Sequence, residues 1–167
     1  MNTLEESLAC PEGIADVSVV VVACFDNPLK EHSIAFLSDA LTQKRRVVIP
    51  VSTIIGAYHI ATRYLKVSKL AIKKVLGGLL ATKSPALYTR ITPELADDAI
   101  EYAAYYDIES WDGYLISVAK SLGTSIIYSL DQQLSKVKEI KVVNPFPEEV
   151  VKQYHDFMKK ALKRKLP

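Results

Sequence analysis

Cysteine, glycine and long apolar runs are scarce in this chain of 167 residues, and each scarcity removes a class of protein. The two cysteines, Cys10 and Cys24, lack Cys-x-x-Cys spacing, so neither a zinc site nor a redox motif is predicted. The longest mostly apolar run, residues 17–25, is far shorter than the ~20 residues that span a bilayer. The six glycines form no phosphate-binding loop, and no Ser-His-Asp spacing points to acyl transfer.

The remaining composition is typical of one globular domain. Hydrophobic residues make up 49% of the chain, enough for one sizeable core. Glu5 and Glu6 stand where a signal peptide would be basic, so we expect a cytoplasmic protein without a membrane anchor. The net charge is only +2, and residues 152–165 concentrate six lysines or arginines against a single acid. We therefore predict a core domain over residues 1–147, including a short N-terminal extension, and a basic C-terminal helix over residues 148–167 that packs on it or trails from it.

Helical and strand patterns alternate along the chain, which predicts an α/β fold. Thr92 and Pro93 form a strong helix start, and the pair Gly77-Gly78 is expected to loosen the end of an earlier helix. A C-terminal amphipathic helix follows Pro147. The predicted helices before it cover residues 30–44, 52–65, 68–79, 92–106 and 111–122, and the predicted strands cover residues 46–49, 87–91 and 125–128.

Three aspartates are expected at one edge of the sheet. Asp112 opens a helix, Asp131 follows the strand that comes after that helix, and Asp16 lies in the other strongly apolar segment. Ligands of open α/β sheets bind at the carboxyl ends of the strands. Three converging carboxylates would repel one another unless a divalent cation neutralised them. Taken singly, Asp112 also suits the positive end of a helix, and Asp131 also suits a turn cap.

Four short motifs follow one another along the chain, namely Asp16-Val17-Ser18, Trp111-Asp112-Gly113, Ser129-Leu130-Asp131 and Asn144-Pro145-Phe146. Together they resemble the motifs of the PIN domains, a family of metal-dependent nucleases that includes the VapC toxins of prokaryotic toxin-antitoxin pairs. The resemblance covers roughly residues 14–146, and the order of the motifs is more specific than any one of them. It implies a three-layer α/β/α fold around a central, mostly parallel twisted sheet. The second motif is Trp-Asp-Ala in this family, so Gly113 stands in place of the alanine.

The resemblance also implies roles and partners. Asp16, Asp112 and Asp131 would be the catalytic carboxylates that hold Mg²⁺ or Mn²⁺, and Ser18 and Ser129 would orient those carboxylates or a bound water. RNA would be the substrate, a homodimer would be common, and an antitoxin protein would be the partner of a toxin. The alternative for each serine is a simple backbone turn.

The segment 14–25 has two interpretations. Periodicity alone favours one strand with Asp16 near its start, whereas the resemblance favours a short strand that ends near Asp16, followed by a helix. Only the second interpretation puts Asp16 in the cleft. Valines do not decide between them, because strand propensity is weak beside tertiary context.

One position departs from the family pattern. Gly56 stands where PIN domains usually carry a glutamate, which weakens the case for metal binding. Glu109 is a candidate substitute, although a solvated surface acid is the alternative. His59 on the same helix is interpreted as a packed or surface residue.

Basic residues suggest where RNA would bind. Arg63, Lys66 and Lys73, together with Lys69 and Lys74, lie on two predicted helices that the family places beside the active-site groove. Lysines and arginines of this kind bind phosphates without sequence preference. A solvated helix face is the alternative.

The favoured hypothesis is a metal-dependent endoribonuclease, with a role as a toxin included. The second hypothesis, encouraged by Gly56, is a catalytically impaired PIN fold that binds RNA or a protein without cleavage. A third, an unrelated α/β small-molecule enzyme, would have an apolar pocket instead of an open acidic groove.

Overall fold

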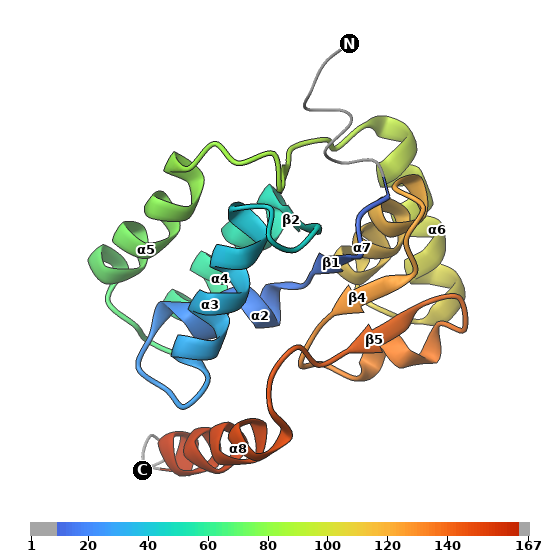
Figure 1. Ribbon diagram of the computed structural model, residues 1–167. Helices are drawn as coiled ribbons and strands as arrows, with labels where there is room; N and C mark the ends of the chain where they lie inside the picture. Colours follow the sequence, from blue (N-terminus) through green and yellow to red (C-terminus); the bar gives the residue numbers. More distant parts are fainter. Residues whose placement is uncertain (1–9, 164–167) are drawn as a thin grey trace.

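A five-stranded parallel sheet forms the centre of the computed structural model, which describes residues 10–163. The predicted N-terminal extension over residues 1–9 and the last four residues of the predicted C-terminal helix lie outside the described residues. The strand order is β3-β2-β1-β4-β5, and every neighbouring pair is parallel (Figure 1). The strands are β1 Gly13–Ala15, β2 Val47–Pro50, β3 Leu87–Tyr88, β4 Ile126–Tyr128 and β5 Lys141–Val143.

Helices cover both faces of this sheet, so the predicted three-layer α/β/α fold is confirmed. One core cluster joins the sheet to α2, η1, α3, α4 and α5, and a second joins it to α6, α7 and η2. Figure 1 shows these two groups on opposite sides of β1 and β4. The helices are α2 Val17–Val21, η1 Val22–Cys24, α3 Lys30–Leu41, α4 Val51–Arg63, α5 Lys69–Ala81, α6 Pro93–Tyr106, α7 Ser110–Ser121, η2 Gln133–Lys136 and α8 Glu148–Lys163.

The first apolar segment is a short strand followed by a helix. β1 ends at Ala15, Asp16 caps α2, and the valines that follow continue into η1. The single-strand interpretation is therefore wrong. The valines are helical because α2 packs against α4 and buries Val19 to Val21, and this burial outweighs their preference for strands.

Several helix boundaries follow local chemistry. Thr92 caps α6 as predicted, with its Oγ1 accepting a hydrogen bond of 3.3 Å from Leu95 N. α4 begins at Val51, one residue before the predicted start at residue 52, and Pro50 occupies its N-cap position. The expected loosening at Gly77 and Gly78 does not occur, because α5 continues to Ala81.

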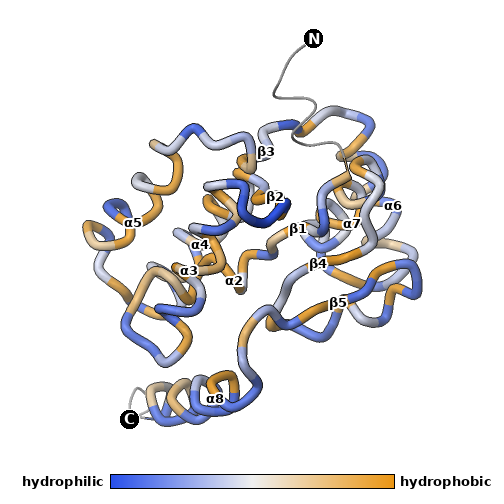
Figure 2. The backbone as a smooth tube through the Cα atoms, viewed as in Figure 1, coloured by the Kyte–Doolittle hydropathy of each residue, from blue (hydrophilic) through white to orange (hydrophobic). Residues whose placement is uncertain are grey.

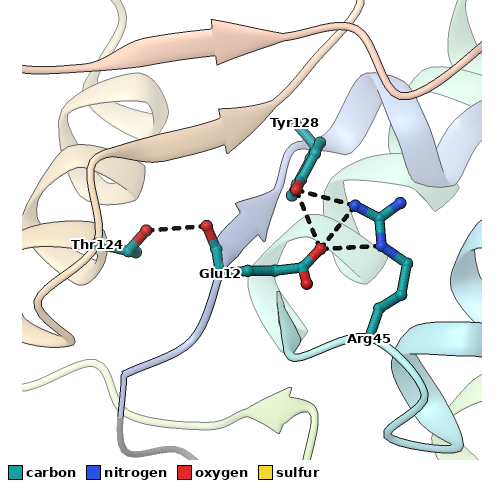
Figure 3. Close-up of polar contacts among 4 residues, drawn as sticks. All are labelled: Glu12, Arg45, Thr124 and Tyr128. Atoms are coloured by element: carbon teal, nitrogen blue, oxygen red, sulfur yellow. Dashed lines mark hydrogen bonds and ion pairs between the residues drawn. The ribbon is translucent and has the colours of Figure 1, made fainter.

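Polar contacts fasten the amino end of the sheet. The Glu12 Oε1 atom accepts hydrogen bonds from Arg45 Nη2 at 2.6 Å and from the Tyr128 hydroxyl at 3.0 Å (Figure 3). Thr124 Oγ1 donates to the backbone carbonyl of Glu12. A Cβ atom at Gly13 would come within 2.6 Å of the Tyr128 ring, so glycine is needed there. These contacts join the approaches to β1 and β2 with β4.

Two expectations from composition can be compared with the fold. Within residues 10–163, no helix is both long and apolar enough to cross a membrane. Cys24 is buried, its thiol donates to Val20 O, and burial raises its pKa to about 11. Cys10 is exposed.

Candidate functional site

Asp16 occupies the turn between β1 and α2 at the carboxyl edge of the sheet. Its backbone is extended, and its Oδ1 accepts a hydrogen bond of 2.6 Å from Val17 N. The side chain is only 5% exposed. A short polar residue at this position satisfies a free N–H group at the start of the helix. The cap therefore fixes a buried carboxylate at the strand end where ligands bind in parallel sheets.

Two serines hold the other oxygen of Asp16. Ser18 Oγ donates to Asp16 Oδ2 at 2.8 Å, and Ser129 Oγ donates to the same atom at 2.7 Å. The two hydroxyl oxygens are 3.2 Å apart. Leu130 N donates to Ser18 Oγ, and Asp131 N donates to Ser129 Oγ at 2.9 Å. The network connects the first and third sequence motifs across the β1–β4 pair.

Asp112 lies half-buried in the first turn of α7. Its pKa is raised to about 7, first by burial and then by the negative charges of Asp16, Glu109 and Asp131. None of the ion pairs among the described residues involves Asp112. The carboxylate thus experiences the negative charges of three acids, and no ion pair in the described part of the chain balances them.

Asp131 and Glu109 lie at the rim of this cluster. Asp131 is exposed, and its Oδ1 accepts a hydrogen bond of 2.9 Å from Gln133 N, so it also serves the turn that begins η2. Glu109 is exposed at the N-cap position of α7, where its side chain makes no capping hydrogen bond. Both acids raise the pKa of Asp112, which places their charges within electrostatic reach of it.

The donor set suits a hard cation in part. Within residues 10–163, no three side chains of His, Cys, Asp or Glu stand close enough together to hold one ion. The three aspartates thus share one electrostatic cluster but do not form a three-ligand cage. Mg²⁺ often needs only one or two carboxylates, because it keeps several of its waters. The all-oxygen, all-acid chemistry of Asp16 and Asp112 fits such a hydrated ion.

Gly56 on α4 lies against Val17, the first residue of α2. A Cβ atom built there would lie 3.3 Å from Val17 Cγ2, and Val17 directly follows Asp16. The position at which the resemblance expects a glutamate therefore borders the start of α2. His59, one turn further along, is exposed and makes an edge-on contact with Tyr64 at 5.7 Å between ring centroids.

Sequence periodicity missed the environment of Trp111. Its ring is 62% exposed, although its spacing with Leu115 groups it with the apolar face of the helix. It meets the Tyr114 ring edge-on at 6.4 Å, and the Tyr114 hydroxyl donates to Arg90 O at 2.8 Å. The only sign of this environment in the sequence is that a tryptophan directly precedes Asp112.

Gly113 explains the departure from the Trp-Asp-Ala motif. A Cβ atom at this position would collide with the carbonyl oxygen of Ala99 on α6. α6 and α7 are the most extensively packed pair of helices in the described chain. The glycine thus permits the close approach of α6 and leaves Asp112 in its place on α7.

The predicted RNA-binding side chains form an exposed basic surface over the end of α4 and the start of α5. An open hollow of about 620 Å³ lies against it, and none of the acids lines this hollow. The basic surface comprises Arg63, Lys66, Lys69, Lys73 and Lys74, and the hollow is lined by Ser68, Leu70, Ala71, Lys73 and Lys74.

Two comparisons with known proteins complete the description of the site. The sequence model described as PIN domain matches residues 14–140, which include all three aspartates. A comparison with curated proteins found no match.

Proposed function

Since the chain belongs to the PIN domain family, whose fold is of the nuclease type, we propose that it is a metal-dependent endoribonuclease that hydrolyses RNA phosphodiester bonds. The observation that carries the proposal is the environment of Asp112. Its charged neighbours in the described chain are all acids. Bringing like charges together costs free energy, and a bound divalent cation removes that cost.

PIN domains generally depend on a divalent metal, and we propose Mg²⁺ or Mn²⁺ here. Such an ion would neutralise the charge that builds up on the phosphoryl oxygens and activate the attacking water. Asp16 would hold the ion in a fixed orientation, because Ser18 and Ser129 constrain its carboxylate. Asp112 would bind it in the deprotonated form, so affinity should rise with pH through about 7. Asp131, which is exposed at the rim of the cluster, would be the third carboxylate that helps to hold the ion.

Trp111 and the basic surface support RNA as the substrate. The Trp111 ring is held by Tyr114 beside Asp112 and offers a face on which an unpaired base can stack. Arg63, Lys66 and Lys73 are exposed and would bind phosphates without sequence preference. Single-stranded RNA is therefore the proposed substrate class, and the proposed location is the cytoplasm.

The second candidate function is binding of RNA or a protein without cleavage, and Gly56 favours it. Glu109 weighs against this alternative, since its charge acts on Asp112 and supplies an acid to the cluster from another element. We propose that Glu109 takes the place of the family glutamate. A role as the toxin of a toxin-antitoxin pair, an antitoxin partner and a homodimer belong to the same proposal.

The decisive experiment is a cleavage assay on single-stranded RNA with purified wild type and Asp112→Asn in parallel. We expect cleavage with Mg²⁺ or Mn²⁺, none with a chelator, and a loss on the order of 100-fold or more in the variant. Asp156→Asn, which removes an exposed acid on α8, is the matched control and should cut like wild type. Equal cleavage by wild type and Asp112→Asn would contradict the proposal that this chain cleaves RNA at the Asp112 site.

Binding of the same RNA without any cutting would establish the second candidate instead. The toxin role is tested by inducing expression of the chain in cells. Growth arrest by wild type but not by Asp112→Asn is the expected result, and growth that is unaffected by either would contradict a toxin.

A further inference from the structure

The motif that follows β5 begins with Asn144, and the proposed function gives it no role. Each of three neighbouring strands, β1, β4 and β5, is largely hydrophobic within the sheet (Figure 2) and is followed directly by a polar residue. These polar residues are Asp16, Ser129 and Asn144. The parallel ladder extends to them, since Asp16 N donates to Tyr128 O at 2.9 Å and Ser129 N donates to Val143 O at 3.1 Å. The three residues therefore form one row at the carboxyl edge, on strands about 5 Å apart.

A second asparagine-proline step, at Asn27, shows what is unusual about Asn144. Asn27 Oδ1 accepts a hydrogen bond of 2.9 Å from Leu29 N, and Asn144 Oδ1 accepts one of 3.0 Å from Phe146 N, so both side chains close the same kind of turn. The amide nitrogen of Asn27 also donates to Val22 O and Phe25 O. Both asparagines are half-buried, but within residues 10–163 nothing accepts a hydrogen bond from the amide nitrogen of Asn144. The turn uses only the oxygen of Asn144, which leaves its two N–H groups available to a ligand.

The other donors around this row are already used. The hydroxyls of Ser18 and Ser129 each carry one proton, and both donate to Asp16 Oδ2. The backbone N–H groups of Leu130 and Asp131 donate to the two serine oxygens. Ionised aspartates can only accept. Within the described chain, Asn144 is therefore the member of the row that can donate hydrogen bonds to a bound molecule.

A phosphate of the RNA backbone is the ligand that suits this donor. A neutral amide donates to phosphoryl oxygens without forming an ion pair with the neighbouring acids, as a lysine would. Asn144 lies one strand beyond Ser129 and two strands beyond Asp16, so it would meet a phosphate beside the one at the acids. The basic surface begins on α4, which follows β2 on the other side of β1. An RNA strand that contacts both places would pass over the acids.

We propose that the amide nitrogen of Asn144 binds a phosphate of single-stranded RNA beside the acid cluster, so that the RNA crosses the carboxyl edge of the sheet from the basic surface to β5. The inference rests on RNA as the ligand in the proposed function, but it does not rest on cleavage. Asn144 is thus a substrate-binding residue, and its loss should change KM more than kcat.

Nuclear magnetic resonance of the side-chain amides tests the contact. The sample is the full-length Asp112→Asn variant with Mg²⁺ and a short single-stranded RNA, and the Asn144 signals are assigned by their loss in a chain that also carries Asn144→Ser. These signals should shift when RNA is added, whereas those of Asn27, whose amide binds within the chain, should stay in place. Asn144 signals that do not move would overturn the proposal, whether or not wild type cleaves RNA. A shift in a chain that does not cleave supports the phosphate site and contradicts only the nuclease.

The cleavage assay supplies a second test. Asn144→Ser keeps an oxygen that can accept from Phe146 N and removes the amide. KM should rise on the order of tenfold, the effect of losing one hydrogen bond to a charged oxygen, while kcat and the melting temperature stay close to those of wild type. Asn27→Ser is the matched control and should lower the melting temperature without changing KM, because the amide of Asn27 binds only the chain. An unchanged KM in Asn144→Ser, or an equal rise in Asn27→Ser, would overturn the proposal. For a chain that binds RNA without cutting it, the dissociation constant of the RNA replaces KM in the same comparison.

Discussion

Two carboxylates at opposite ends of the sheet have contrasting surroundings. At the amino end, Glu12 accepts two hydrogen bonds from Arg45 and one from the Tyr128 hydroxyl (Figure 3). At the carboxyl end, Asp112 is half-buried, its pKa is raised to about 7, and the charges that act on it are negative. The chain thus supplies a countercharge to one half-buried acid, Glu12, and further acids to the other, Asp112.

The contrast separates a structural acid from a functional one. An acid with its cation in the chain stabilises the fold, whereas an acid among acids destabilises it and persists when function requires it. The two ends should therefore respond to mutation with opposite signs.

Arg45→Met should destabilise the protein. The change removes the two hydrogen bonds that Arg45 donates to Glu12 and the one that it donates to the Tyr128 hydroxyl. It also removes a cation that lies 4.9 Å from the centroid of the Phe36 ring and 5.1 Å from that of the Tyr128 ring. We expect a loss of about 3 kcal/mol in the free energy of unfolding, measured by urea denaturation. Lys44→Met is the control. Lys44 is more exposed than Arg45, and its Nζ lies 3.9 Å from Asp39 Oδ1, which is a long ion pair, so this substitution should cost little stability. Equal effects of the two variants would contradict a structural role for the amino-end cluster.

Asp112→Asn should stabilise the protein while it abolishes cleavage. The pKa of Asp112 is raised from 3.8 to about 7, so between these values the folded state keeps a proton that the unfolded state loses. The loss of wild-type stability caused by ionising Asp112 is therefore absent below about pH 4, grows as pH rises and is complete above about pH 7. The full shift corresponds to about 4 kcal/mol, which solvent screening of a half-exposed group reduces to about 2 kcal/mol.

Thermal unfolding as a function of pH measures this effect. Without metal at about pH 8, Asp112→Asn should melt roughly 4–8 °C above wild type, and the difference should shrink as pH falls toward about 5. Asp156→Asn, on exposed α8, is again the control and should show no such trend. A variant that melts lower than wild type at about pH 8 would mean that Asp112 has a stabilising partner.

A divalent cation should reduce the repulsion among the acids at the carboxyl end of the sheet and leave the Glu12–Arg45 cluster at the amino end unaffected. Mn²⁺ or Mg²⁺ at ten times its dissociation constant should stabilise wild type by about 1.4 kcal/mol at about pH 8. The stabilisation should fade below about pH 7, as protons replace the ion on Asp112, and it should be absent in Asp112→Asn. Arg45→Met should retain it in full. A metal effect of equal size in Asp112→Asn, read from melting curves, would place the ion elsewhere.

Local chemistry in the sequence predicted much of the scaffold. The alternation of helix and strand patterns predicted the α/β fold, the family resemblance implied the mostly parallel sheet, and the helix start at Thr92 was found where it was expected. The positions of Asp112 and Asp131 relative to their helix and strand also follow from nearby residues. Periodicity left the segment around Asp16 open between strand and helix, because burial against α4 decides it.

Contacts between segments that are far apart in the sequence could not be predicted from local patterns. The hydrogen bond from Ser129 to Asp16 requires the register of β4 on β1, which no local pattern encodes. The need for glycine at Gly113 appears only when α6 lies against α7. Trp111 is exposed because it precedes the buried part of α7, although its spacing matches the apolar face. The metal-holding roles of the aspartates stay predictions.

Gly56→Glu gives the smallest expected effect and tests whether the carboxyl end tolerates one more acid. The Cβ atom would lie 3.3 Å from Val17 Cγ2, a close contact that a small shift relieves. Replacing a helical glycine contributes about 1 kcal/mol of stability, and an added negative charge near Asp112 removes a similar amount. Gly56→Gln is the matched control, because it has the same shape and helix propensity without the charge. In the absence of metal, the glutamate variant should be the less stable of the two by about 1 kcal/mol at about pH 8, and added Mn²⁺ should reverse that order. If both variants respond equally to Mn²⁺, an acid at position 56 does not reach the ion. That result would contradict the proposal that Glu109 takes the place of an acid at this position.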